Sequence, residues 1–283
     1  MSRPAAGFSS GPVNRAGLEL TAVLGPVRSQ NAFEETVERL LTVIKLGVIG
    51  PGERFPAERE LAVLLGVSRL TLREAIRALQ HAGYVESRRG RFGGTFVTYT
   101  RPSPSPADLG RIAGEEAGRL ADALTFRMAV ETGAVQILAR AVAGSAGSKG
   151  AGGSAGSGGR DTVEGIDPAE VAEALRGRLE AVNHASLEDY RRMDTLLHLS
   201  MAELTGSSLL AAACADARMR LNDLLNAIPL LQHNIDHTVA QHTAIVDAIL
   251  AGNTWQAQRA VAEHLDGTGA LLRGFLADPD RFC

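Results

Sequence analysis

The sequence lacks any apolar run long enough to cross a membrane. A spanning helix needs about 20 consecutive apolar residues, and Glu19 interrupts the mildly apolar stretch near the N-terminus. We therefore predict neither a membrane anchor nor a secretory signal. Cysteine is also scarce, with Cys214 and Cys283 alone in 283 residues. Two cysteines imply no disulfide framework, so we expect the reducing environment of the cytoplasm.

No charge of either sign dominates the chain, whose formal net charge is −3. An apolar content of 45% and a charged content of 22% are ordinary for a soluble protein, which argues against a wholly disordered chain. The charge is unevenly divided, however. Residues 30–100 carry ten basic side chains against eight acidic ones, whereas residues 101–283 carry sixteen against twenty-three. The length is sufficient for two domains that each bury a core.

Residues 56–83, PAERELAVLLGVSRLTLREAIRALQHAG, have the pattern of two helices joined by a tight turn at Gly66. In the second helix one apolar stripe faces inward, formed by Leu72, Ile76 and Leu79. The opposite face is basic, with Ser68 at its start and Thr71 nearby, and it carries Arg69, Arg73 and Arg77. An arginine-rich helix with an apolar back fits the major groove of DNA. The alternative is a solvated helix in which Glu74 partly neutralises its neighbours.

The next segment, YVESRRGRFGGTFVTY, changes to the alternating pattern of a β-hairpin. Its tip is rich in glycine and arginine and contains Arg88, Arg89 and Arg91. Directly after a reading helix, such a hairpin is a wing whose arginines can reach phosphates or the minor groove. Simple solvation of the loop is the alternative.

From Pro56 to Val97 the sequence resembles the winged-helix domain of GntR-superfamily transcription regulators, in the FadR-like branch. The resemblance implies operator contacts from the first helix of the pair, from the reading helix and from the wing, at Arg59, Arg69, Thr71, Arg73, Arg89 and Gly90. Ser68, at the start of the reading helix, is a further candidate. Leu70 departs from the family pattern, which usually has a small polar residue there, so the resemblance does not indicate which base is preferred.

We predict a mainly α protein, in which a winged helix-turn-helix precedes an all-α bundle of six antiparallel helices. The expected order is a disordered tail (1–30), the DNA-binding domain (31–100), a linker opening with RPSPSP (101–117) and the bundle (118–283). Within the bundle, residues 144–160 are almost entirely Gly, Ser and Ala, and we predict a flexible surface loop there.

Four polar residues fall on inward faces of three predicted helices. Asp194 and His198 are four residues apart on one face, while His242 and His264 share the apolar faces of two later helices. Burying them unpaired would cost on the order of several kcal/mol, so we predict a common divalent metal. Zinc is the first candidate, with nickel, manganese or iron as alternatives. Taken singly, each histidine is more often an ordinary helix residue, and His233 and His237 form a competing pair that we rank lower.

The segments FRMAVE (126–131), D-x-x-x-H (194–198), QHTAIVDAI (241–249) and AEHL (262–265) resemble the FCD-type effector domain of the same branch. The resemblance implies that the matching Asp and three His bind metal and that small organic acids coordinate it. Members that respond to fatty-acyl-CoA lack this set. Arg127 is then expected to line the pocket and bind a carboxylate of the effector. The alternative is that Arg127 forms a surface ion pair with Glu131. Asn222 is a second candidate for effector binding.

We therefore predict a cytoplasmic transcription regulator, with a repressor expected from the family. A homodimer would place two reading helices on a palindromic operator of double-stranded DNA, and a bound organic acid would alter operator affinity. Two alternatives remain: a purely structural metal, or a metal-dependent hydrolase. We predict no enzyme, because no HExxH-type arrangement of ligands and general base is present.

Overall fold

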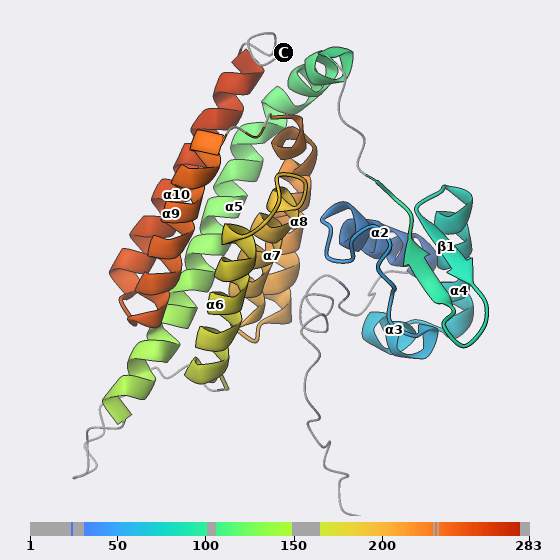
Figure 1. Cartoon of the computed structure of the whole chain (residues 1–283), viewed down its shortest axis with the longest axis horizontal. Helices are drawn as coiled ribbons and strands as arrows, with labels where there is room; N and C mark the ends of the chain where they lie inside the picture. The colour runs from blue at the N-terminus through green and yellow to red at the C-terminus, as the bar shows by residue number, and fades with distance from the viewer. Residues whose placement is uncertain are drawn as a thin grey trace, which may run out of the picture.

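The computed structural model describes residues 31–100, 106–148, 165–228 and 232–277, together with Leu24 and Leu230. Figure 1 shows a helical bundle beside a smaller domain of helices and one hairpin. Within the smaller domain, α2 lies on the side that faces the bundle. Among the helices described, none combines the length and apolarity needed to cross a bilayer.

The smaller domain is the predicted winged helix-turn-helix. It consists of α2 (Ala32–Lys45), α3 (Glu58–Leu65), α4 (Arg69–His81), β1 (Val85–Arg88) and β2 (Gly94–Val97). Gly66 has a left-handed backbone with φ 65°, which allows the sharp turn between α3 and α4. The two strands are antiparallel, with Val85 opposite Val97, and a bridge from Arg54 to Phe96 extends the sheet. The predicted fold class is thereby confirmed for this part of the chain.

The larger domain contains six helices in its described part. They are α5 (Pro106–Ser148), α6 (Pro168–Asn183), α7 (Tyr190–Glu203), α8 (Ser208–Ala227), α9 (Gln232–Leu250) and α10 (Thr254–Ala277). In Figure 1, α9 and α10 lie on one side of the long α5, and α6, α7 and α8 on the other. Asp167 caps α6, since its carboxylate accepts from the backbone N–H of Ala169 at 2.9 Å, and Pro168 occupies the first turn.

Two predicted boundaries in this region were wrong. The segment 101–117 was expected to be a linker, but α5 already begins at Pro106. The flexible loop was expected over 144–160, but α5 continues to Ser148, because adding residues to an established helix is easier than starting one. The rest of that loop lies outside the described residues. The expected tail over 1–30 also lies outside them, except for Leu24, whose side chain is fully buried.

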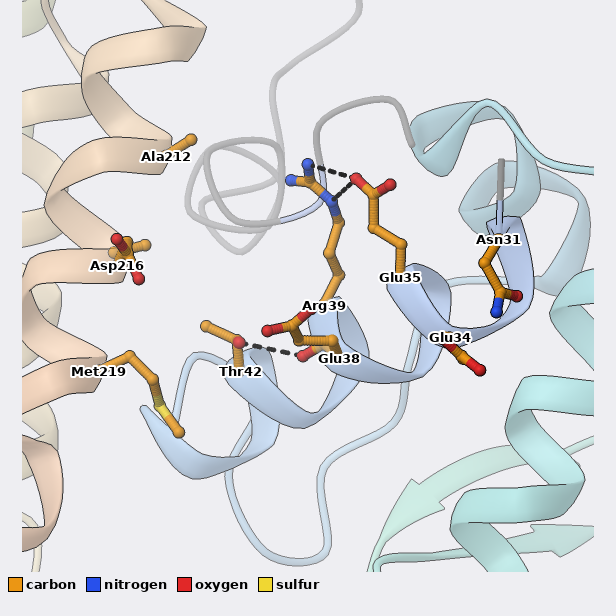
Figure 2. A pocket seen from close by; sticks show the side chains of 10 residues that line it. Asn31, Glu34, Glu35, Glu38, Arg39, Thr42, Ala212, Asp216 and Met219 are labelled. Carbon is orange, nitrogen blue, oxygen red and sulfur yellow. Dashed lines mark hydrogen bonds and ion pairs between the residues drawn. The ribbon is translucent and has the colours of Figure 1, made fainter. Parts of the chain in front are cut away.

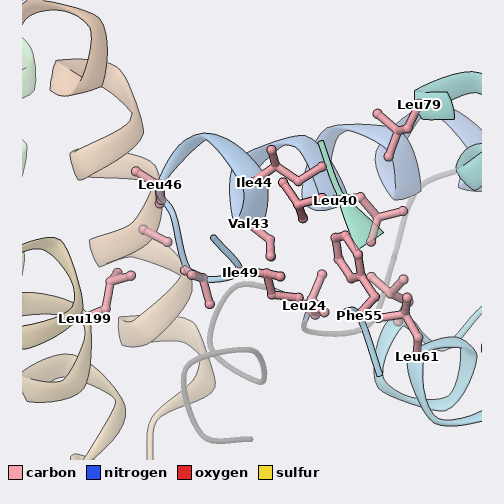
Figure 3. Close-up of a cluster of buried hydrophobic side chains, with 14 of the residues drawn as sticks. Leu24, Leu40, Val43, Ile44, Leu46, Ile49, Phe55, Leu61, Leu79 and Leu199 are labelled. Carbon is pink, nitrogen blue, oxygen red and sulfur yellow. The ribbon is translucent and has the colours of Figure 1, made fainter. Parts of the chain in front are cut away.

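One hydrophobic cluster joins the two domains. Figure 3 shows Leu40, Val43 and Ile44 of α2 in the interior of the winged helix, with Leu46 and Ile49 extending toward the bundle. The same cluster includes bundle residues from α5, α7 and α8, namely Val130, Ala134, Leu196, Leu199, Ala202, Cys214 and Ala215. The loop that follows α2 is therefore packed against α7 and α8, which fixes the position of the DNA-binding domain relative to the bundle in this structure.

Candidate functional site

The reading helix α4 presents the basic face that the sequence predicts. Arg69 and Arg73 are exposed, as is Arg59 on α3. None of these three forms an ion pair with another described residue, so all three guanidinium groups are available to phosphates or base edges. The apolar stripe packs inward, through Leu72, Ala75, Ile76 and Leu79.

The two hydroxyl groups predicted to contact DNA are engaged within the helix itself. The Oγ of Ser68 accepts from the backbone N–H of Thr71 at 3.0 Å, which makes Ser68 the N-cap of α4. The two side-chain hydroxyls also lie 2.8 Å apart. Ser68 and Thr71 therefore stabilise the start of the reading helix, and the exposed Ser68 retains lone pairs for further contacts.

The wing places its arginines in two different environments. Arg88 forms an ion pair with Glu86, and its guanidinium lies 4.3 Å from the centroid of the Phe96 ring, so it is held against the sheet. Arg89 is exposed at the turn, and the adjacent Gly90 has φ 100°, a conformation that favours glycine. The predicted contact residues Arg89 and Gly90 thus form the exposed tip of the hairpin.

The four predicted metal ligands come together inside the bundle. Asp194, His198, His242 and His264 each offer one ligand atom, and these atoms all lie within 4.8 Å of one another. The Nε2 atoms of His198 and His242 are 3.3 Å apart, and Asp194 Oδ1 is 3.3 Å from His242 Nε2. Two nitrogens on one tetrahedral zinc ion lie about 3.3 Å apart, given a Zn–N distance of about 2.0–2.1 Å. The donor set and its spacing therefore fit a divalent metal.

Neighbouring side chains set two of the imidazole tautomers. The Nδ1 of His198 lies 2.6 Å from Glu131 Oε2, and the Nδ1 of His264 lies 3.1 Å from Gln241 Oε1. Both partners are acceptors, so each Nδ1 carries the proton and each Nε2 keeps its lone pair for a metal. Burial lowers the pKa of His198 to about 4 despite the opposing effect of Glu131, so this imidazole is neutral near pH 7.

A buried arginine, Arg218 on α8, completes the cluster, and the sequence analysis missed it. Its Nη2 donates to Asp194 Oδ2 at 2.5 Å and to Thr195 Oγ1 at 3.2 Å. Its Nη1 lies 3.8 Å from Glu131 Oε1. Burial is the largest single effect on Asp194 and opposes its ionisation. The charge of Arg218, together with the hydrogen bond from His242 and the charges of His198 and His242, outweighs that effect and holds the pKa of the carboxyl well below its usual value. The only sign of its burial in the sequence was that this arginine lies on the same helix face as residues that are otherwise apolar.

A cavity of about 80 Å³ adjoins the metal cluster. Asp194 and His264 line it together with Arg127, whose side chain is 2% exposed and whose Nε donates to Glu131 Oε1 at 2.8 Å. The expected alternative of a surface ion pair is therefore wrong, because the pair is buried. Arg127 Nη1 makes no hydrogen bond with any described residue. An unpartnered, buried guanidinium nitrogen beside a cavity is a ready donor for an anionic ligand.

Three other candidate residues are not among those that line this cavity. Asn222 is not among its lining residues, and its amide donates to Asp223 Oδ1 at 3.2 Å, so the structure gives no support to a role in effector binding. The helix that carries Asn222, α8, contributes Leu225 to the cavity lining instead. His233 and His237 are both exposed on the first turns of α9, and neither belongs to the cluster of four potential ligands inside the bundle.

A larger pocket of about 530 Å³ lies between the two domains. Figure 2 shows it between α2 and α8, with Glu34, Glu38 and Asp216 among the labelled side chains. The acidic side chains outnumber the single basic one, Arg39, which pairs with Glu35. An anionic effector would be repelled here, so the smaller cavity beside the histidines is the better candidate for such a ligand.

A winged helix with exposed arginines, joined to a helical bundle that contains a partly enclosed cavity, defines a two-domain DNA-binding regulator. Residues 33–97 match the family described as bacterial regulatory proteins of the gntR family, and residues 160–267 match the FCD domain. The chain therefore belongs to the GntR superfamily of transcription regulators, in its FCD-containing branch.

Individual relatives agree with this assignment. The transcriptional repressor NanR of Escherichia coli K12 is 27% identical over 88% of each chain. A protein of Mycobacterium gastri, named as a candidate HTH-type transcriptional regulator, RmpR, is 50% identical over 68 residues, which cover 24% of each chain. Similarity to solved structures is weaker: E. coli McbR/YncC superposes with a TM-score of 0.44 at 16% identity, covering 88% of this chain and 99% of that chain.

Proposed function

We propose that this regulator binds a divalent metal in its bundle and that a small carboxylate on that metal controls operator affinity. The single observation that carries the proposal is the meeting of three buried imidazoles and Asp194 beside a cavity lined by Arg127. When bound, the metal supplies positive charge, and a metal that takes five or six ligands would have positions beyond the four protein ligands for carboxylate oxygens. Zinc is the first candidate, and nickel, manganese or iron would suit the same ligands.

The residues of the chain have separate roles in this proposal. Glu131 and Gln241 orient the imidazoles of His198 and His264, and Arg218 keeps Asp194 ionised. Arg127 Nη1 remains free to donate to the carboxylate. A cavity of about 80 Å³ suits an acid of only a few non-hydrogen atoms. One curated relative, of E. coli K12, is named as a candidate regulatory protein of the L-lactate dehydrogenase operon, at 26% identity over 88% of this chain, which agrees with an organic acid of that size.

Regulation would proceed through two winged helices on one operator. Two copies related by a two-fold axis would present their reading helices to the half-sites of a palindrome. NanR is named a repressor. We propose that this protein is a repressor too, and that ligand binding lowers its affinity for the operator. The coupling free energy between such sites is typically about 1–3 kcal/mol.

The test is a thermal-shift screen of small carboxylates on the full-length protein, with zinc and with a chelator. A true effector stabilises the zinc-loaded protein, by about 2.7 kcal/mol at 100 times its dissociation constant, and leaves the chelated protein unchanged. His242→Ala should abolish both zinc binding and the carboxylate response. His233→Ala, an exposed histidine on the same helix, is the matched control and should behave as the natural protein does.

A purely structural metal remains the competing account. In that case chelation would lower the melting temperature, while carboxylates would still act on the chelated protein. Operator affinity measured with and without the carboxylate then separates the two accounts. The proposal fails if the response of operator affinity to the carboxylate survives in His242→Ala.

A further inference from the structure

Leu70 is an exposed apolar side chain on the part of α4 that faces DNA. It is the second residue of that helix, and 59% of its surface is exposed. The residues of α4 that pack in the core are Leu72, Ala75, Ile76 and Leu79. Leu70 lies outside this stripe, so the stability of the domain does not require a leucine at this position.

The side chains around Leu70 are polar or charged. Arg69 precedes it and is exposed, while Ser68 and Thr71 bond to each other across the helix start. Exposed leucines are ordinary on protein surfaces, and Leu187 in the bundle is 58% exposed. The position of Leu70 is what distinguishes it, because the N-terminal residues of a reading helix are those that contact base edges.

The chemistry of the major groove restricts what a leucine can recognise. Thymine alone presents a methyl group there, whereas the edges of the other bases carry hydrogen-bond donors and acceptors and no methyl group. A leucine placed against those polar edges would remove water without replacing its hydrogen bonds, which is unfavourable. Contact with a methyl group instead buries apolar surface on both partners.

We propose that Leu70 contacts the 5-methyl group of a thymine in the operator and thereby selects a T·A pair at that position. This inference rests on the DNA-binding role of α4. Leu70 would then read a base in addition to the arginines. Selection of thymine would also be the effect of having leucine, rather than the small polar residue usual in the family, at this position. Arg69 and Arg73 on either side would hold the helix at the depth where Leu70 reaches the base.

The test begins by selecting the operator from a random DNA library with the full-length protein. Each thymine of the selected site is then replaced singly by deoxyuridine, which removes the methyl group and keeps every hydrogen-bonding group. In each half-site of the operator, we expect one thymine at which this replacement weakens binding about fourfold. A fourfold loss corresponds to about 0.8 kcal/mol, the contribution of one buried methyl group. Leu70→Ser should bind thymine and deoxyuridine equally at that position.

Leu187→Ser is the matched control, since it removes an equally exposed leucine from the bundle and should retain the fourfold effect. Binding to random-sequence DNA at low salt verifies that Leu70→Ser is folded, because that binding depends on phosphate contacts. The proposal is overturned if no thymine shows a methyl effect, or if Leu70→Ser shows the same effect as the natural protein. A selection that enriches no sequence overturns the DNA-binding role of α4 itself, and with it this proposal.

Discussion

Arg192 of α7 forms an ion pair with Glu53 of the winged helix, with 2.7 Å between Nη2 and Oε2. The Nε of the same guanidinium donates to the carbonyl oxygen of Gly47 at 2.7 Å. Arg192 lies two residues before Asp194 on the same helix. The helix α7 therefore contacts the loop after α2 and also carries two residues of the candidate metal cluster, Asp194 and His198. In the proposed mechanism, a ligand on the metal would act on the DNA-binding domain through this helix.

We predict that Arg192→Ala separates ligand binding from the DNA response. The carboxylate identified by thermal shift should still bind the zinc-loaded variant with an affinity within about twofold, because Arg192 does not line the cavity. The ratio of operator affinities with and without that carboxylate should fall toward one, from the roughly 5- to 150-fold typical of coupled sites. Arg259→Ala, which breaks an exposed pair with Glu263 on α10, is the control. An undiminished ratio in Arg192→Ala would exclude this route.

The orientation of His264 by Gln241 gives a second prediction. Replacement of Gln241 by Leu removes the acceptor that fixes the Nδ1 proton of His264, and loss of such a partner typically weakens metal affinity about 10–100-fold. Competition titration with a zinc indicator measures the change. Gln232→Leu, at an exposed position on the same helix, should leave zinc affinity unaltered. Equal affinities for the two variants would show that Gln241 has no part in the site.

The sequence was sufficient for the parts of the structure that depend on local periodicity. The reading helix, its N-cap and the hairpin follow from spacing and turn chemistry, and so do the inward faces of the helices that carry Asp194 and the three histidines. The ends of α5 were predicted poorly, because Gly-rich and Pro-rich flanks indicate loops even where a long helix continues through them.

Long-range partners could not be predicted in the same way. Arg218 and Glu131 lie on different helices, 87 positions apart in the sequence, and no periodicity indicates that they meet beside Asp194. The contact of Arg192 with Gly47 spans 145 positions. Such pairs depend on how the helices cross, which single-sequence patterns do not determine.

Arg218 provides a third prediction, on stability. Replacing it with Met removes this cation from the buried Glu131 and from Asp194, which is 20% exposed, and breaking a largely buried pair from one side costs about 3–5 kcal/mol. At about 2–4 °C per kcal/mol for a domain of this size, the melting temperature of the metal-free protein should fall by roughly 6–20 °C. Adding Asp194→Asn should recover part of the loss, because the two residues are coupled. Arg220→Ala, at an exposed position on the same helix, should change stability by less than about 1 kcal/mol.

Glu203, at the C-terminal end of α7, gives a prediction for pH. Burial raises the pKa of its carboxyl to about 8, with Arg178 opposing the shift only in part. The folded protein therefore binds this proton more tightly than the unfolded chain, and stability falls as the pH rises from about 4.5 toward 8. Glu203→Gln removes the ionisable group, so its melting temperature should equal that of the natural protein near pH 5 and exceed it by several degrees near pH 8.5. The difference between the two proteins across this range isolates Glu203 from the other titrating groups, and a difference independent of pH would show that Glu203 is already ionised in the folded state.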